Sequence, residues 1–435
     1  MIVLLAMAGI PAAADRLQDQ AAPEAPPGPE VTKAAAHFIK AKQCIEKESY
    51  DEAIDLLTEV LEELPLVDDH VLYWRSLAYE KKGDIDRALS DLSLIRSLKP
   101  DTLLLKKLRR REIEIGTKTD TGEIGVMLKE FVDDYPGELD MKLLYARHLE
   151  RQGNHDAARR LFREIYVTAS PLSEVAAHEL TPAGISTQDL VVRGKNLNAA
   201  FLFSDAEQCF RAALHKGIVD SRTDIEQGLA RSLFGQKRYR EAAELYKKGR
   251  SPHWYARSLL RARQIETFEA ELPRLRQHRD SRLAPVFIAY GNVKRREGDM
   301  KKALSVFRDV SARYPAARED AIWAIGWMQY RSGNYKAALR TFLDLYKRHG
   351  DTRYRYWVNK CRQRLDEEVT HSSAQEGDVS HRDFYGFLSL LSRGGSLPAV
   401  AKASESREET LPPRISILIA LGLTDDAASE LLSLS

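Results

Sequence analysis

The sequence predicts an all-α fold, a solenoid or superhelix built from helical hairpins, and two observations lead to this prediction. The first is an internal repeat: the pattern of residues 50–65 recurs at 85–100, and that of 298–315 recurs at 333–350, each time 35 residues later. The second is that apolar and polar residues nowhere alternate over a length that would make a strand. One period in two distant parts of the chain indicates stacked copies of a hairpin, each burying its apolar face against its neighbours.

Each position of the repeat has a physical reason. A small residue in the first helix, such as Gly326, lets the second helix approach closely, and a glycine at the turn, such as Gly333, suits a left-handed cap. A second small residue opens the contact face of the second helix, and an apolar residue four positions later lies on that face, as Ala338 and Phe342 do. Proline then ends the helix, as at Pro315.

This pattern resembles the tetratricopeptide repeat, whose unit is a pair of antiparallel helices. The segments 101–140 and 252–282 have helical patterns but match the repeat too weakly to be given a register. We expect the tetratricopeptide-like array to cover residues 31–366, and a C-terminal helical segment with an FYG segment and an LGL hairpin to cover 367–435. Seven hairpins can be aligned, and their second helices are expected to begin near residues 50, 85, 155, 203, 239, 300 and 335.

The first 30 residues differ from the repeats in composition. Residues 2–10 are apolar and Ala12–Ala14 follow, which is typical of a secretory signal and its cleavage site, although a basic leading region is missing. A short buried helix is the alternative. Because four prolines follow, we expect a signal peptide over 1–14, a proline-rich linker over 15–30 and a periplasmic location. The apolar segment is too short to span a bilayer, and no transmembrane segment is expected in the mature chain.

Composition and motifs argue against several classes of function. The chain has 435 residues, of which 66 are basic and 64 acidic. Because these charges nearly balance, no nucleic-acid partner is expected. The basic run 106–112 is interpreted as an exposed helix face. The three cysteines lack metal-ligand spacing, and Cys44 and Cys209 lie within helical patterns as small buried residues. No cofactor is expected, because phosphate loops and nucleophile motifs are missing. The polar cluster within 371–383 lacks the spacing of a metal site.

The last third of the chain has its own series of motifs. A hairpin with the pattern W..GW..Y..G.Y..A...F occupies 323–342, and a helix carrying Tyr356 and Trp357 follows. An aromatic FYG.L segment comes next at 384–388, and an LGL..DA..EL hairpin comes last at 421–431. In this order the motifs resemble the superhelical, non-catalytic region of bacterial soluble lytic transglycosylases, a long array of tetratricopeptide-like hairpins. The resemblance implies a periplasmic scaffold that guides or holds peptidoglycan and a catalytic domain.

One departure from that family decides what can be inferred about catalysis. The family's catalytic domain carries a glutamate in an E-S-x-F/Y context and a later G-L-M-Q-x-x-P segment, and nothing in the chain matches them. No catalytic residue can be assigned, and whether the chain is part of an enzyme is left open. We expect either a fragment of a longer reading frame or a catalytically empty relative, and the uncapped apolar run at the end of the sequence favours a fragment.

Aromatic residues near the end of the array are the candidate binding residues. Such rings can stack on sugars, although aromatic residues at repeat positions also commonly fill the space between hairpins. Tyr354 and Tyr356, which arginines flank, are expected to reach the surface. The alternative function is a tetratricopeptide adaptor that binds periplasmic protein segments in its concave groove. The candidates for contact with a glycan or a partner are Tyr354, Tyr356, Trp357, Phe384 and Tyr385.

Overall fold

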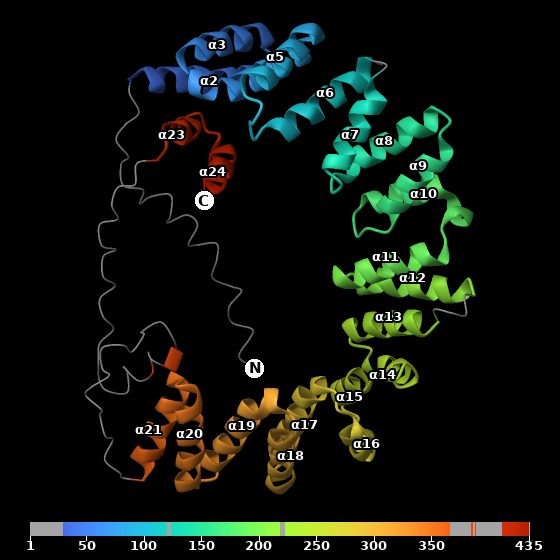
Figure 1. Ribbon diagram of the computed structural model, residues 1–435, viewed down its shortest axis with the longest axis vertical. Helices are drawn as coiled ribbons and strands as arrows, with labels where there is room; N and C mark the ends of the chain where they lie inside the picture. The colour runs from blue at the N-terminus through green and yellow to red at the C-terminus, as the bar shows by residue number, and fades with distance from the viewer. Residues whose placement is uncertain are drawn as a thin grey trace. The chain divides into compact units, whose positions relative to one another are not determined.

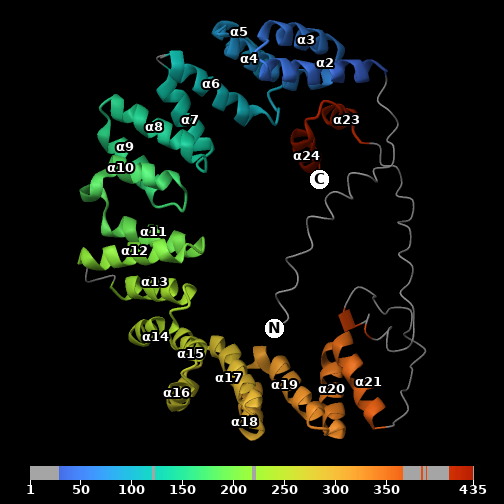
Figure 2. The ribbon, with the colours of Figure 1, turned by 180° about the vertical axis from the view of Figure 1, so that it is seen from behind.

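The computed structural model describes the helical part of the chain in two compact units. Every regular element among the described residues is a helix, and consecutive helices pair into hairpins, so the predicted all-α solenoid is confirmed (Figures 1 and 2). The first unit comprises residues 1–158 and 405–435, and the second comprises 159–404. The residues described are 29–119, 123–217, 222–365, 384–385, 388 and 411–434.

In the first unit, consecutive helices pack side by side, with α2 on α3, α3 on α4 and α4 on α5. The short 3-10 helix η1 (Pro65–Val67) connects the first two hairpins, and α9 (His155–Tyr166) crosses the division between the units. The other helices are α2 (Pro29–Glu46), α3 (Tyr50–Glu63), α4 (Asp68–Lys82), α5 (Ile85–Leu98), α6 (Leu105–Thr119), α7 (Ile124–Asp134), α8 (Leu139–Arg151), α23 (Pro413–Ala420) and α24 (Thr424–Ser433).

The second unit continues the pattern of hairpins, in which α11 packs on α12, α17 on α18, and α19 on α20. The 3-10 helices η2 (Ser281–Leu283) and η3 (Pro315–Ala317) precede two of its helices. Its α-helices are α10 (Leu172–Gly184), α11 (Thr187–Ala199), α12 (Phe203–His215), α13 (Arg222–Gly235), α14 (Tyr239–Lys248), α15 (Pro252–Arg261), α16 (Ile265–Gln277), α17 (Ala284–Arg296), α18 (Met300–Arg313), α19 (Arg318–Arg331), α20 (Tyr335–His349) and α21 (Thr352–Arg364).

The register predicted from the repeat is confirmed. The two segments that matched too weakly form hairpins as well, α6 with α7 and α15 with α16. Their helices are as regular as the others, so the weak match reflects residue identity and not a change of fold. The seven aligned second helices begin at Tyr50, Ile85, His155, Phe203, Tyr239, Met300 and Tyr335.

Close contact between the two helices of a hairpin explains the small residue in the first helix. A Cβ atom on Gly326 would lie 2.7 Å from Cε1 of Phe342, and one on Gly291 would lie 2.6 Å from Cε1 of Phe307. Both phenylalanines are fully buried. The predicted role of Gly326 as a contact between helices is therefore confirmed, and a larger residue there would displace the ring below it.

Many of the described hairpins turn through one residue in the left-handed conformation, two positions before the second helix. In some hairpins this residue is glycine, as at Gly83 with φ of 92° and Gly333 with φ of 78°. Glycine adopts this conformation without the steric cost that other residues incur. Other hairpins keep the same geometry with a residue that carries a side chain: Glu48, Phe201, Lys237 and Arg263, with φ of 62°, 62°, 66° and 58°.

The C-terminal hairpin packs on the first helices of the same unit, although more than 300 residues of chain separate them (Figure 1). Helix α23 contacts α2 and η1. Its Ile415 and Leu418 are buried in one cluster with Phe38, Leu57 and Val71 from the first repeats. The apolar face of the LGL hairpin is therefore covered by the beginning of the helical array.

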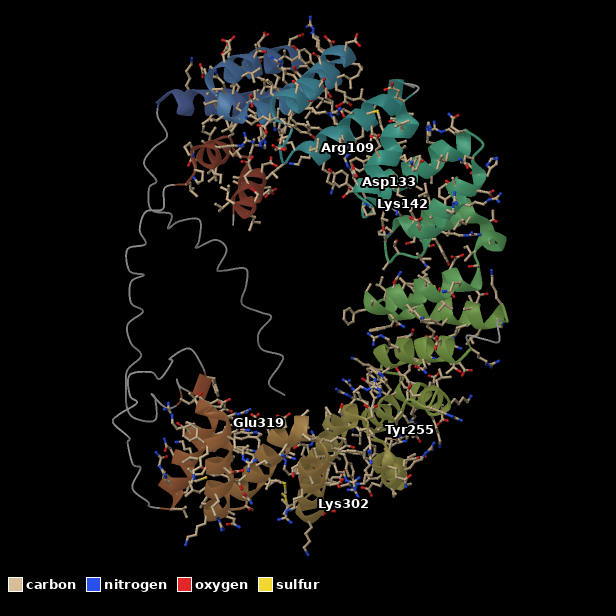
Figure 3. All side chains as sticks on the ribbon, viewed as in Figure 1. Arg109, Asp133, Lys142, Tyr255, Lys302 and Glu319 are labelled. Atoms are coloured by element: carbon tan, nitrogen blue, oxygen red, sulfur yellow. The ribbon has the colours of Figure 1, made fainter. Side chains whose placement is uncertain are left out.

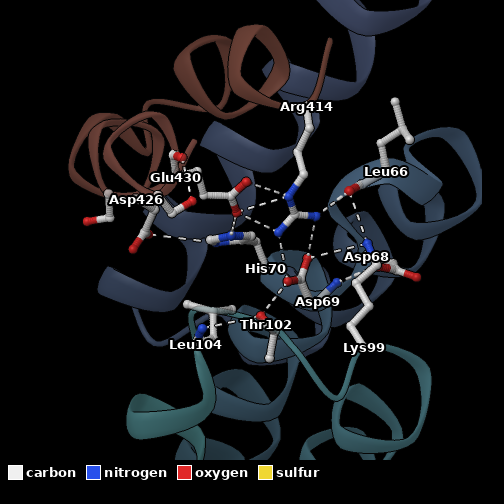
Figure 4. Close-up of polar contacts among 12 residues, drawn as sticks. Leu66, Asp68, Asp69, His70, Lys99, Thr102, Leu104, Arg414, Asp426 and Glu430 are labelled. Carbon is white, nitrogen blue, oxygen red and sulfur yellow. Dashed lines mark hydrogen bonds and ion pairs between the residues drawn. The ribbon is translucent and has the colours of Figure 1, made fainter. Parts of the chain in front are cut away.

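A buried ion-pair network fixes this hairpin in place (Figure 4). The Arg414 guanidinium donates to both carboxylate oxygens of Asp69, at 2.8 and 3.0 Å, and to Glu430 at 2.7 Å. Thr102 Oγ1 also donates to Asp69 at 2.7 Å. Burial alone would raise the pKa of Asp69, but the hydrogen bonds from Arg414 and Thr102 and the nearby charges outweigh it and lower the pKa to about 2. His70 lies 3.5 Å from Glu430, and burial lowers its pKa.

The predictions for the N-terminal residues lie mostly outside the described part of the chain. The proposed signal peptide, 1–14, and most of the proposed linker, 15–30, precede the first described residue. Helix α2 begins at Pro29, where proline fits the first position of a helix because the amide there needs no partner. Among the described helices, none combines the length and the apolar composition needed to cross a membrane.

Candidate functional site

Half-buried aromatic rings gather on the last helices of the second unit. Trp323, Trp327 and Tyr330 are spaced by four and three residues on α19, which places them on one face of that helix. Tyr356 and Trp357 lie on α21, and both are half-buried as well. These five residues form the aromatic surface.

The rings of the aromatic surface contact one another over a buried base. The centroid of the Trp357 ring lies 4.5 Å from that of Trp327 and 5.0 Å from that of Tyr330. Trp323 stacks on Trp327 at 6.4 Å, and its ring also lies 5.3 Å from that of the fully buried Phe342 of α20. The rings therefore have fixed positions, held by contact with the core of the hairpin.

The prediction that Tyr354 reaches the surface is wrong. Its side chain is fully buried on α21, within the cluster that contains Phe342 and Leu345. Its hydroxyl donates to Glu319, which also accepts from Arg353 at 3.0 Å. Burial, followed by the hydrogen bond to Glu319, raises the pKa of Tyr354. One position along a helix turns a side chain by about 100°, so Tyr354 faces the core while its neighbours on α21 do not.

The other candidates are placed at or near the aromatic surface. Phe384 is 66% exposed and packs edge-on against Tyr385. The Tyr385 ring lies 5.8 Å from Tyr356, so Tyr385 extends the aromatic surface of α21. Whether Tyr356, Trp357, Phe384 and Tyr385 contact a ligand stays a prediction.

Cations border the aromatic surface. The Arg353 guanidinium lies over the Trp323 ring at 5.0 Å, and Lys360 Nζ lies over the Tyr356 ring at 5.5 Å. Glu319, labelled in Figure 3, is the carboxylate beside Arg353, and it is engaged by that arginine and by Tyr354. The aromatic surface therefore combines half-buried rings with cations that lie over two of them.

The basic run at 106–112 lies on α6 and is taken up by ion pairs within the first unit. Lys106 pairs with Glu138 at 2.5 Å, and Arg110 pairs with Asp140 at 2.5 Å. Arg109, labelled in Figure 3, pairs with Asp134 of α7 at 2.5 Å. The run therefore joins α6 to the helices that follow it.

A cavity of about 730 Å³ between α15 and α17 is a second candidate site, which the sequence analysis missed. Arginines border it, namely Arg257 and Arg261 from α15 and Arg296 from α17. Trp254 and Val286 contribute to its apolar walls. Arg257 and Arg261 are four residues apart in sequence, which could have indicated a basic site. Such spacing is also common on exposed helix faces, so it does not distinguish a site from ordinary surface.

Among the described residues, no group of three or more His, Cys, Asp or Glu side chains could hold a metal ion. The polar cluster at 371–383 lies outside them. The three cysteines are all buried and unpaired. Burial raises the pKa of Cys361 to about 12, which makes its thiolate scarce at neutral pH.

Comparison with known proteins supports the repeat assignment. The tetratricopeptide repeat family matches residues 127–174, which contain α8 and α9. The chain therefore contains a helical-repeat region of tetratricopeptide type, a class of scaffold that presents concave surfaces to protein partners. None of the curated proteins matches the chain.

Several solved structures share the helical-repeat arrangement at low similarity. The human IFIT1 dimer with PPP-AAAA is 13% identical, with a TM-score of 0.34, over 77% of this chain and 91% of that one. Yeast Tom70 is 13% identical, with a TM-score of 0.30, over 77% of this chain and 96% of that one. A tetratricopeptide repeat protein from Parabacteroides merdae is 14% identical, with a TM-score of 0.25, over 56% and 93%. Similarity this low transfers no function.

Proposed function

We propose that the chain is a non-catalytic periplasmic scaffold of the kind that lytic transglycosylases carry, and that it guides peptidoglycan strands and holds a catalytic domain lying outside these residues. The observation that carries the proposal is the aromatic surface on α19 and α21. Its rings are half-buried and held in place from below, so they keep an exposed face without collapsing into the core. The order of motifs from Trp323 to Leu431 and the apolar start of the chain agree with it.

Binding of glycan by the aromatic surface is tested by sedimentation with purified peptidoglycan sacculi. Trp327→Leu keeps an apolar side chain in contact with Trp357 but removes the flat ring, so retention on sacculi is expected to fall. Trp74→Leu is the matched control, because Trp74 is a half-buried tryptophan of α4 in the first unit. Circular dichroism of both variants checks that the helices are intact.

Two outcomes contradict the proposal. The first is a wild-type chain that does not sediment with sacculi at low salt. The second is equal retention of the Trp327→Leu variant, the Trp74→Leu variant and the wild type, because the aromatic surface would then not be the contact.

The proposed location is tested by recovering the chain from a periplasmic extract and sequencing its N-terminus. Removal of a signal peptide predicts a mature start near Asp15, after the run of alanines. A chain that starts at Met1 and stays in the cytosolic fraction contradicts the location.

A protein adaptor is the second candidate function, and the cavity between α15 and α17 favours it. Helical-repeat scaffolds of this type commonly bind extended segments in grooves between successive helices. A pull-down that returns one protein partner, together with no retention on sacculi, would favour the adaptor over the glycan scaffold.

A further inference from the structure

The cavity between α15 and α17 has an unusual balance of charge. Four arginines border it, and three of them, Arg257, Arg261 and Arg296, are exposed and make no ion pair among the described residues. The fourth, Arg282, pairs with Asp280 at 2.9 Å. The cavity therefore presents at least three positive charges without neutralising carboxylates.

Several other arginines of the second unit are placed differently. Arg238 of the α13–α14 turn contacts Glu207 and Glu241, and Arg276 of α16 pairs with Asp309 at 3.1 Å. In these places a carboxylate from another helix neutralises the arginine. Among the described residues no carboxylate pairs with Arg257, Arg261 or Arg296 at the cavity, which makes an anionic ligand the simplest complement.

The floor of the cavity is apolar. Val286, Pro285 and Val293 of α17 line it together with Leu260 of α15. An inorganic anion would fill only a small part of about 730 Å³ and would leave this floor in water. The ligand that fits both features has acidic groups at the rim and an apolar side chain that reaches the floor.

The aromatic ring at the cavity is already engaged. Trp254 stacks on Tyr246 at 5.7 Å, and the Arg257 guanidinium lies over its ring at 5.2 Å. These contacts leave little of the ring for a nucleobase, whereas single-stranded nucleic acids rely on such stacking. Burial, and then the charge of Arg282, lower the pKa of the neighbouring His253.

We propose that the cavity between α15 and α17 binds an acidic polypeptide segment of a partner protein, with carboxylates at Arg257, Arg261 and Arg296 and an apolar side chain on the floor. Arg257 and Arg261 lie one helical turn apart on α15. They can therefore pair with two acidic side chains that project from the same side of an extended segment. This site is separate from the aromatic surface and does not depend on glycan binding.

Fluorescence anisotropy with a short fluorescein-labelled peptide tests the proposal on the full chain. The peptide carries glutamates on both sides of a central phenylalanine, and we expect saturable binding at low salt. Replacing the glutamates with glutamine, or the phenylalanine with alanine, is expected to weaken binding, since the rim and the floor each contribute. Arg261→Glu is expected to reduce the affinity about tenfold or more.

Two further variants keep the test decisive. Arg340→Glu is the matched control, because Arg340 of α20 is exposed and also lacks an ion pair among the described residues; its affinity is expected to stay unchanged. Ala289→Trp fills the cavity from an exposed position on α17 without altering charge, and it is expected to abolish binding of the peptide.

Three results would overturn the proposal. One is a peptide that does not bind the wild type. Another is equal loss in the Arg261→Glu and Arg340→Glu variants, which would indicate general attraction to the surface. The third is tighter binding of a labelled oligothymidylate of equal charge, which would assign the cavity to nucleic acid. None of these results depends on retention by sacculi. Failure of this proposal can therefore be distinguished from failure of the proposed glycan-binding scaffold.

Discussion

Arginines in two regions of the molecule, Arg414 in the C-terminal hairpin and Arg261 at the cavity of α15 and α17, have opposite surroundings. Arg414 contacts two carboxylates and the carbonyl oxygen of Leu66. Arg261 is exposed and contacts no carboxylate among the described residues. The same side chain therefore stabilises the fold in one region and is left open to solvent in the other. The difference separates residues that serve stability from those available to a partner.

The two arginines also differ in how much the stability of the fold depends on them, because a buried carboxylate faces Arg414. Asp69 is 1% exposed, and leaving it without a cation inside the protein would be costly. No carboxylate depends on Arg261 in this way. Substituting the two arginines alike should therefore separate the two regions.

The largest expected effect is that of Arg414→Met. Removing the guanidinium leaves Asp69 and Glu430 without their shared partner, and loss of one member of a buried pair costs about 3–5 kcal/mol. We expect α23 and α24 to detach while the other helices stay folded, because contacts in a repeat protein are local. Hydrogen exchange measured by mass spectrometry on the peptides of residues 413–433 checks this.

Arg261→Met is the matched control for that experiment. It should leave exchange across α15 and across the C-terminal hairpin as in the wild type. Unchanged protection of α23 in the Arg414→Met variant would mean that the apolar cluster alone holds the hairpin.

The second effect is a loss of stability in acid. The pKa of Asp69 in the folded chain is about 2, below its ordinary value of 3.8. The stabilisation it provides is therefore fully present above pH 3.8 and is lost as the pH falls towards 2, with a size of about 2 kcal/mol. His70, whose pKa is also lowered, acts in the same direction: its contribution is lost as the pH falls below 6.5. Asp69, Arg414, Asp426 and Glu430 are the charged groups around it.

Urea denaturation followed at several pH values measures this effect. The midpoint for the first unit should fall between pH 6.5 and pH 2, and the fall between pH 3.8 and pH 2 should be smaller in the Arg414→Met variant, because burial without the guanidinium no longer favours the ionised form of Asp69. A midpoint that is independent of pH over this range would contradict the role given to Asp69 and His70.

The sequence predicted most of the fold because the repeat encodes local packing. Gly326 and Phe342 sit in direct contact, and spacing alone indicated it. The weakly matching hairpin of α15 and α16 shows where this reasoning fails. Its second helix carries the fully buried Phe268 at the position where Ala53 and Ala338 provide the small residue, so the fold persists while the pattern is lost.

The candidate sites were harder to predict, because exposure depends on packing between hairpins. Tyr354 and Tyr356 each follow an arginine in sequence, but only the first turns into the core. The contact of Arg414 with Asp69 joins residues 345 positions apart, and no local pattern indicates such a pair. The cavity of α15 and α17 likewise depends on how two separate helices approach each other.

A smaller effect is expected for Lys107→Ala, which tests the edge of the Arg414 network. Lys107 Nζ lies 2.6 Å from Asp426, but the lysine side chain is 52% exposed. Solvent screens such a pair, so the loss of stability should stay below about 1 kcal/mol. Hydrogen exchange of α24 should change slightly, and the change should vanish at high salt. A loss of stability as large as that of Arg414→Met would show that the contribution of an ion pair to stability does not follow its burial here.

The smallest expected effect on stability, and the sharpest test of the comparison, is that of Arg261→Met. Because no buried group relies on this arginine, its unfolding free energy should stay within about 0.5 kcal/mol of the wild type. The same variant should nevertheless bind the acidic peptide more weakly than Arg340→Met does. Stability and binding would then respond to different arginines, as expected when one guanidinium is satisfied inside the fold and the other is left for a ligand. A marked loss of stability in Arg261→Met would instead place Arg261 among the residues that maintain the fold.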